Sequence, residues 1–262
     1  MLDVVQASKF IKKHINFNGE TGIILGSGLG DFTDLLDNKK TLSFSKIPFY
    51  PQSNIEGHAG DLISGFIGDK QILVAKGRVH FYEGYSIKNV VFPIQVLKKC
   101  GVKNLIITNS SGSLRKEFQP GTIMLIQGYL DCSFRENLAD PILKINKKYF
   151  SRRLNNLVKK IALKENINLY SGNYCWTLGP AYETPSEIEY FKRLGGSAVG
   201  MSTFPEVVEA GRLNLRVLTL SVLTNYAAGL SKFPLTHEEV LKTALKAKNN
   251  FIKILSNLIR RI

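Results

Sequence analysis

Short apolar segments alternate with segments of helical periodicity along the chain, and this alternation limits the possible folds more than any other feature. Strands are predicted over residues 21–25, 61–67, 71–75, 104–108, 121–126, 198–199 and 215–223, and helices over 3–16, 86–100, 149–165, 185–194, from 203 onward and from 236 to the C-terminus. Residues 128–145 show no clear period and are expected to form a loop. Strands that alternate with helices favour an α/β fold with a central mixed β-sheet and helices on both faces. No linker, repeat or low-complexity tract divides the sequence, so residues 1–262 are expected to form a single domain.

Polar, glycine-rich runs follow several of these predicted strands directly. They carry Ser27, Asn109-Ser110-Ser111, Met201-Ser202 and Asn225. In open α/β sheets the ligand crevice lies beyond the carboxyl ends of the strands. We therefore expect these segments to converge there.

The segment 179–206 contains two predicted helix starts. Thr-Pro-Ser-Glu at 184–187 has the form of a capping box with proline at the first helical position, which places Glu183 just outside a helix. Thr-Phe-Pro-Glu at 203–206 repeats the capping pattern and places Ser202 just ahead of a second helix. A carboxylate and a hydroxyl are thus each expected at a helix N-terminus. A segment that only fills a core would not need polar groups at these positions.

The composition argues against several classes of protein. Hydrophobic residues make up 44% of the chain, enough for a full core. No run of about 18 apolar residues exists, so no transmembrane helix is expected, and no signal peptide is visible, so the expected compartment is the cytoplasm. The three cysteines are far apart and form no CxxC motif, which predicts neither a disulfide framework nor a metal site.

The net charge of +14 has two interpretations. It fits an anionic partner such as nucleic acid, a membrane or phosphate, and it equally describes a lysine-rich, solvated surface. The lysines are spread along the chain, and no block of Lys and Arg with interleaved aromatic residues is present. The solvated surface is therefore the preferred interpretation, and neither nucleic acid nor a membrane is expected as a partner.

The run Gly-Ser-Gly-Leu-Gly at 26–30 is a candidate anion loop. A dinucleotide fingerprint would require glycine where Asp31 stands, and no Gly-Lys-Ser/Thr follows to make a Walker A loop. What remains is a short glycine loop with the Ser27 hydroxyl, which could wrap one small anion with backbone N–H groups. A tight turn between strand and helix explains the same residues equally well.

A second candidate for anion binding is the segment 78–82. If it is extended, Arg78, His80 and Tyr82 point to the same face. Arginine offers a bidentate fork for phosphate, and a protonated histidine adds a donor. An ordinary surface strand is the alternative. Ser202, ahead of a helix N-terminus, adds a third element suited to phosphate.

Glu183 and Asn225 suit the recognition of a planar heterocycle. A carboxylate accepts two N–H donors, and an amide donates and accepts at once, so the pair fits the edge of a 6-oxopurine. Alternatively, Glu183 only complements a helix dipole. His237 is expected at a helix start, where the positive end of the dipole disfavours imidazolium, so a neutral ring would suit a hydroxyl ligand. His58 lies in a Gly-His-Ala-Gly loop and its role stays open.

In their order along the chain, these segments resemble those of the purine nucleoside phosphorylases of the homotrimeric, low-molecular-mass type. The matching stretches are Gly26–Gly30, Gly57–Gly60, Gly77–Tyr85, Thr108–Gly112, Gly179–Thr184, Val199–Glu206, Thr224–Asn225 and His237–Val240. The resemblance implies pentosyl transfer in purine salvage: a purine (2′-deoxy)ribonucleoside and inorganic phosphate give free base and (deoxy)ribose 1-phosphate, with no metal or cofactor. It also implies a homotrimer.

The resemblance further implies a role for each matching residue. Phosphate would be held by Ser27, His58, Arg78, His80, Ser110 and Ser202, and the nucleoside by Tyr82, Tyr182, Glu183, Val199, Met201, Asn225 and His237; the catalytic candidates are Asn225, His80 and Glu83. The implied transition state has oxocarbenium character at C1′. The phosphate dianion stabilises that cation and then attacks it, while Asn225 stabilises the charge on the departing purine.

Departures from the family pattern bear on the substrate. The family's usual Asn-Ala-Ala-Gly-Gly is Asn-Ser-Ser-Gly-Ser at 109–113, and the following Leu-Arg is similar to the related methylthioadenosine phosphorylases. The region between Gly128 and Asn146 is shortened where the family holds a loop that sends a phenylalanine into the neighbouring subunit's site. Phe134 is a candidate for that phenylalanine.

Three residues favour 6-oxopurine nucleosides, inosine and guanosine, over methylthio-nucleosides. They are His237, which suits a polar 5′-hydroxyl, Ser202 in place of threonine, and Asn225 in place of the aspartate that would favour 6-aminopurines. The alternatives are phosphorolysis of methylthioadenosine, methylthioinosine or xanthosine. A basic nucleotide- or RNA-binding protein that uses the same pocket without catalysis is the alternative from another class.

Overall fold

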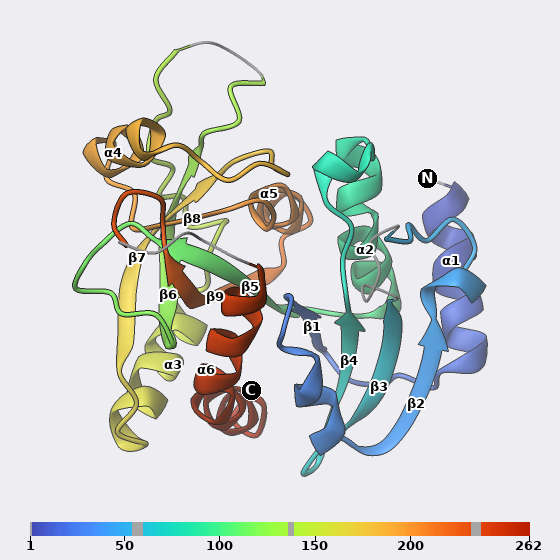
Figure 1. Ribbon diagram of the computed structural model, residues 1–262. Coiled ribbons are helices and arrows are strands. Elements are labelled where there is room, and N and C mark those ends of the chain that lie inside the picture. The colour runs from blue at the N-terminus through green and yellow to red at the C-terminus, as the bar shows by residue number, and fades with distance from the viewer. Residues whose placement is uncertain (1, 54–59, 136–138, 232–236) are drawn as a thin grey trace.

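In the computed structural model, the described residues form one mixed sheet of nine strands with helices packed around it (Figure 1). The described residues are 2–53, 60–135, 139–231 and 237–262, without the side chains of 237–242 and 244. The strands are β1 (Thr21–Leu25), β2 (Asp37–Ser43), β3 (Asp61–Ile67), β4 (Lys70–Lys76), β5 (Asn104–Ser113), β6 (Thr122–Asp131), β7 (Leu169–Trp176), β8 (Ala198–Gly200) and β9 (Arg216–Tyr226). The helices are α1 (Leu2–His14), α2 (Ile87–Cys100), α3 (Arg152–Lys164), α4 (Pro185–Arg193), α5 (Phe204–Arg212) and α6 (His237–Ile259).

The sheet combines an open half with a closed one. Its strand order is β2-β3-β4-β1-β5-β8-β7-β6-β9, and β5 pairs with β9 as well as with β1 and β8. The pairings among β5, β8, β7, β6 and β9 therefore close a ring. Since β4, β1, β5 and β9 are parallel neighbours, their carboxyl ends meet at one edge of the sheet.

Helices cover both faces of the sheet, which confirms the predicted α/β arrangement (Figure 1). Successive residues of β1 alternate between the faces, as the pleat requires. Ile24 joins the core beneath α1, α2 and α5, whereas Ile23 and Leu25 join the core beneath α3 and α6. A smaller cluster packs Ile188 and Phe191 of α4 against β7 and β8.

Local signals account for where two of the helices begin. The Ser86 hydroxyl accepts the Asn89 N–H at 3.3 Å and starts α2, which ends at Gly101 in a left-handed conformation with φ of 115°. Thr184 and Glu187 form the predicted capping box at the start of α4. Both predicted caps are confirmed.

Three segments differ from the sequence-based expectation because pairing partners, not local hydrophobicity, decide their conformation. β5 continues through its polar residues to Ser113, where we expected a loop after Thr108, because β9 and β8 supply a ladder partner to each side. β6 likewise extends to Asp131, into the segment expected to be loop. β2 and β7 were not predicted, since β2 is mostly exposed and polar and β7 is half exposed over its first residues.

The predicted cap of α5 is wrong. Thr203 makes no side-chain capping hydrogen bond, and its backbone has φ of 78° and ψ of −50°. The Phe204 N–H instead donates to the Ser202 carbonyl at 2.9 Å, which makes residues 202–204 a γ-turn. The Thr203 side chain is thereby available for a buried network described below.

In the part of the chain that the structure describes, no helix is both long and apolar enough to cross a membrane.

Candidate active site

One cavity collects most of the predicted site residues. It opens where β1, β4, β5, β8 and β9 end and is lined by Ser27, Arg78, His80, Tyr82, Ser110, Tyr182, Glu183, Val199, Met201, Ser202 and Asn225. Of the remaining predicted residues, His58 lies outside the described residues. His237 begins α6 as expected, but its side chain is not among those described. Glu83 reaches the site through His80.

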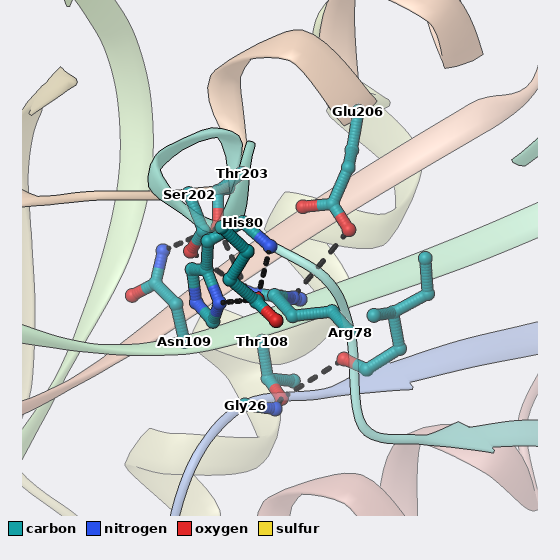
Figure 2. A network of polar contacts seen from close by, with 10 residues as sticks. Gly26, Arg78, His80, Thr108, Asn109, Ser202, Thr203 and Glu206 are labelled. Carbon is teal, nitrogen blue, oxygen red and sulfur yellow. Dashed lines mark hydrogen bonds and ion pairs between the residues drawn. The ribbon is translucent and has the colours of Figure 1, made fainter. Parts of the chain in front are cut away.

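The glycine loop after β1 is fixed tightly against β5. A Cβ atom on Gly26 would lie 2.6 Å from the Asn109 Cα, so only glycine fits there. The Gly26 N–H donates to Thr108 Oγ1 at 3.1 Å, and the Ser110 hydroxyl donates to the Ser27 carbonyl at 2.9 Å (Figure 2 shows Gly26 with Thr108). The loop is therefore a tight turn that also lines the cavity, so both interpretations of the sequence describe part of it.

Arg78 lies at the centre of a network of polar contacts on one side of the cavity (Figure 2). Its Nη1 donates to Ser202 Oγ at 3.0 Å and to Thr203 Oγ1 at 3.3 Å, and its Nε lies 3.4 Å from Glu206 Oε1. Arg78 and Glu206 are both buried. Among the described residues, Arg78 Nη2 is a buried N–H donor without a hydrogen-bond partner, and Arg78 is one of the residues that line the cavity.

His80 is held by Glu83 through two contacts. The Glu83 carboxylate accepts the His80 backbone N–H at 2.7 Å and lies 3.1 Å from the ring Nδ1. Because a carboxylate only accepts, Nδ1 carries a proton. Burial raises the pKa of Glu83, but the hydrogen bonds from His80 and Ser53 outweigh it and lower the pKa to about 2. Glu83 thus stays anionic and fixes the orientation of the His80 ring through its Nδ1–H.

Two tyrosines line the same cavity as neutral donors. The Tyr82 ring stacks on His80 with centroids 4.8 Å apart. Burial, followed by the nearby Glu83 and Tyr182, raises the pKa of Tyr82 to about 12. Burial and the adjacent Glu183 also raise the pKa of Tyr182. Because β4 ends at Lys76 and Tyr82 lies in a short 3-10 helix, this placement arises from the turn and not from an extended strand.

Glu183 faces the cavity from the loop before α4. Its Oε1 accepts the Thr177 hydroxyl at 2.7 Å. Burial raises the pKa of Glu183, the Thr177 hydrogen bond opposes that rise, and the negative charge of Glu187 adds to it. A desolvated carboxylate with remaining lone pairs suits N–H donors of a ligand. A carboxylate that only complements the helix dipole would not need to be buried at a cavity.

The Asn225 amide is fixed at the opposite strand, β9. Its Oδ1 accepts the Thr224 hydroxyl at 2.9 Å, and its Nδ2 donates to the Tyr226 carbonyl at 3.0 Å. A Cβ atom on Gly112 would lie 3.0 Å from that nitrogen, so β5 leaves just enough space for the amide. One N–H and one oxygen lone pair remain, which is an edge that both donates and accepts.

Three buried polar residues of the site were not predicted: Asn109, Thr203 and Glu206. Asn109 Nδ2 donates to Thr203 Oγ1 at 2.9 Å, and Glu206 pairs with Arg78 (Figure 2). Asn109 belongs to a polar run that the sequence shows directly, whereas the pattern at 203–206 predicts only a helix cap for Thr203 and Glu206. Their contacts join positions about a hundred residues apart, which no local pattern reveals.

Within the described residues, no group of three or more His, Cys, Asp or Glu side chains could hold a metal ion. The groups that line the cavity offer hydrogen bonds and fixed charge: donors around Arg78 on one side, and a carboxylate and an amide on the other.

Comparisons with known proteins point to one family. The sequence profile described as the Phosphorylase superfamily matches residues 20–260. Purine nucleoside phosphorylase 1 of Geobacillus stearothermophilus is 38% identical to this chain over 266 residues, which cover 99% of this chain and 97% of that protein.

Solved structures of Schistosoma mansoni purine nucleoside phosphorylase have the same fold. The structure in complex with adenosine superposes with a TM-score of 0.91 at 31% identity and covers 100% of this chain and 98% of that one. The structure in complex with inosine gives a TM-score of 0.90 at 30% identity, with coverage of 100% and 97%.

Proposed function

The chain belongs to the phosphorylase superfamily as a purine nucleoside phosphorylase, and from this premise we propose that its preferred substrates are the 6-oxopurine nucleosides inosine and guanosine. The enzyme transfers the pentose of a purine nucleoside to inorganic phosphate and releases the free base. One observation carries the proposal on the substrate: Glu183 and the donor-acceptor edge of Asn225 face the same cavity as the anion donors around Arg78.

The anion donors suit the phosphate half of the reaction. Arg78, in the loop after β4, and Ser202, before α5, offer N–H and O–H donors, and His80 adds an N–H donor when its ring is protonated. The Ser27–Ser110 contact fixes the glycine loop beside them. A phosphate dianion held there lies in a partly buried site, where its charge stabilises a cation at C1′ more than it would in water. The phosphate oxygen then forms the new bond to C1′.

The other half of the cavity suits the leaving group. As the C1′–N9 bond breaks, its electron pair stays with the purine. Asn225 stabilises that charge at the N7/O6 side, while Glu183 accepts N–H donors of the base. Tyr82, Met201 and His237 are assigned to the ribose, and Tyr182 and Val199 to packing near the base.

The choice between 6-oxo and 6-amino substrates depends on Asn225. The Schistosoma relative has been solved with either adenosine or inosine, so the fold alone does not select one of them. The Thr224 hydroxyl donates to Asn225 Oδ1 and Asn225 donates to Tyr226, so the amide is held in one orientation. An amide held in this way can donate to O6 of a 6-oxopurine, which an aspartate cannot do.

The test is chromatographic assay of inosine, guanosine, adenosine and methylthioadenosine, each with and without phosphate. We expect phosphate-dependent release of hypoxanthine and guanine. Release of adenine from methylthioadenosine as the main reaction would keep the reaction type and overturn the proposed substrate. Base release without phosphate would overturn the assignment of Ser27, Arg78, His80 and Ser202 to phosphate.

We also propose that the enzyme is a cytoplasmic homotrimer whose residues 1–262 form a single domain. The resemblance to the trimeric family supports the assembly, as do exposed apolar side chains after β6, namely Phe134, Ile142 and Ile145. All three cysteines are free and buried, which suits a reducing compartment. Light scattering coupled to size exclusion should give three times the chain mass; the mass of one chain would contradict the trimer.

A further inference from the structure

Thr203 adopts a backbone conformation that is rare for its residue type. It has φ of 78° and ψ of −50° and is fully buried. A β-branched residue at positive φ, in a γ-turn of this hand, persists only where its surroundings hold it in place. The contacts that hold Thr203 therefore indicate what the strained turn does.

The Thr203 hydroxyl has three polar neighbours (Figure 2). Asn109 Nδ2 donates to it at 2.9 Å, Arg78 Nη1 donates to it at 3.3 Å, and Ser202 Oγ lies 3.2 Å away. A hydroxyl has two acceptor lone pairs and one proton. Because the two N–H groups occupy both lone pairs, the Thr203 proton is directed to Ser202 Oγ.

The orientation of Asn109 is fixed in turn from deeper in the sheet. The Ser221 hydroxyl of β9 donates to Asn109 Oδ1 at 2.5 Å, which turns Nδ2 toward Thr203. Since the Ser221 proton is used in that bond, the neighbouring Ser111 hydroxyl, 2.6 Å away, donates to Ser221. The hydrogen bonds thus run in one direction from Ser111 in β5 to Ser202 at the cavity.

The end of this chain determines what Ser202 can do. Ser202 Oγ accepts from Arg78 Nη1 at 3.0 Å and from Thr203, so both of its lone pairs are filled. Toward a ligand, the Ser202 hydroxyl can then act only as a hydrogen-bond donor. The Tyr174 hydroxyl also lies near Ser202, but a phosphate oxygen is charged and is the stronger acceptor.

We propose that Thr203 is a positioning residue of the phosphate site. Its hydroxyl presets Ser202 as a hydrogen-bond donor and holds Arg78 Nη1 in place, so that the unused Arg78 Nη2 and the Ser202 O–H are oriented before phosphate arrives. Preorganised donors of this kind bind the anion without the cost of reorientation. This proposal rests on the proposed function of the same cavity.

The test is steady-state kinetics with inosine and inorganic phosphate on Thr203→Val, which removes the hydroxyl and keeps the branched shape. We expect KM for phosphate to rise about five- to tenfold, the effect of losing a hydrogen bond of about 1 to 1.4 kcal/mol. KM for inosine at saturating phosphate should stay within about twofold. Thr203→Ser, which keeps the hydroxyl, should restore KM for phosphate.

Two further variants separate positioning from folding. Thr203→Gly also lacks the hydroxyl but tolerates positive φ without strain, so it should fold and show the same rise in KM for phosphate. Thr219→Val is the matched control, because Thr219 is equally buried and its hydroxyl accepts from Tyr129 at 2.7 Å. It should lose comparable stability while KM for phosphate stays that of the wild type.

Each outcome decides the matter. An unchanged KM for phosphate in Thr203→Val and Thr203→Gly overturns the proposal. A rise of the same size in KM for phosphate and in KM for inosine also overturns it. If the wild type shows no phosphate-dependent reaction, the proposed function fails, and calorimetry with inorganic phosphate on the same variants tests Thr203 separately. If Thr203→Val binds phosphate more weakly than Thr219→Val does, the positioning role is supported. If the two variants bind phosphate equally, or neither binds it, the positioning role is overturned.

Discussion

Single residues decide the chemistry of this site because each polar atom has a limited number of hydrogen bonds. At Asn225, one N–H and one lone pair are left after Thr224 and Tyr226 have taken the others. At Arg78, the Nη1 hydrogens are used by Ser202 and Thr203, while Nη2 has no partner among the described residues. The N–H groups and lone pairs that are left over are those available to bind a ligand.

Asn225→Ala should lower kcat far more than it raises KM for inosine. The amide meets charge that develops on the purine only as the bond to C1′ breaks, and loss of one such donor typically costs on the order of a hundredfold or more in kcat. Steady-state kinetics with inosine at saturating phosphate measures both constants. Unchanged turnover would remove Asn225 from the catalytic candidates.

Glu183 should set the acid limb of the pH profile for inosine. Burial raises the pKa of this carboxyl, and only the ionised form accepts N–H donors of the base. The value of kcat/KM should therefore rise with pH through an apparent pKa above that of an ordinary glutamate. Glu183→Gln should be weaker overall and should lose this limb; a limb that persists in the variant would assign it to another group.

At the scale of elements, the ends of strands and helices carry the site. β5 brings Asn109, Ser110 and Ser111 to the cavity as strand residues, because its ladder with β9 continues past the apolar part. The start of α4 fixes the loop that holds Glu183, and the γ-turn before α5 aims Ser202. Short, well-capped element ends therefore act as rigid supports.

Thr184→Ala should reveal the contribution of the α4 capping box. Loss of a threonine cap costs about 1 kcal/mol of unfolding free energy. Because the capped turn follows Glu183 directly, KM for inosine should also rise, by about two- to threefold. Denaturant unfolding and steady-state kinetics measure the two effects.

Ser151→Ala is the matched control for this variant. The Ser151 hydroxyl accepts the Leu154 N–H at 3.4 Å and caps α3. We expect a similar loss of stability with KM for inosine unchanged. A rise in KM of the same size in both variants would show that α4 has no special part in holding Glu183.

At the scale of the whole molecule, parallel pairing brings segments that are far apart in sequence to one edge. The carboxyl ends of β1, β4, β5 and β9 supply the glycine loop, Arg78, Asn109 and Asn225 to the same cavity. The unfolded chain holds none of these groups together. Binding of phosphate is therefore coupled to folding.

Phosphate should raise the midpoint of thermal unfolding. A ligand that binds only the folded state stabilises it by about 2.7 kcal/mol at a hundred times its Kd, which corresponds to about 5 °C or more for a chain of this size. Ser202→Ala should show a smaller shift at the same phosphate concentration. An equal shift in both proteins would place the anion elsewhere.

Seven of the nine strands, the helices, the caps of α2 and α4, and most of the polar residues that line the cavity were predictable from the sequence. These features depend on neighbours within a few residues: periodicity, a glycine, a serine three residues before its N–H donor. Arg78, Ser202 and Asn225 stand directly at the ends of apolar segments, so their place at the edge of the sheet follows from topology.

Only the tertiary structure decided the rest. The closed ring of strands, the polar extension of β5, the ion pair between Arg78 and Glu206, and the strained turn at Thr203 all depend on partners distant in sequence. The Thr203 hydroxyl meets Asn109 and Arg78 across 94 and 125 positions of the chain. A local pattern therefore predicts a helix cap at Thr203, because its real partners come from β5 and from the loop after β4 once the sheet has formed.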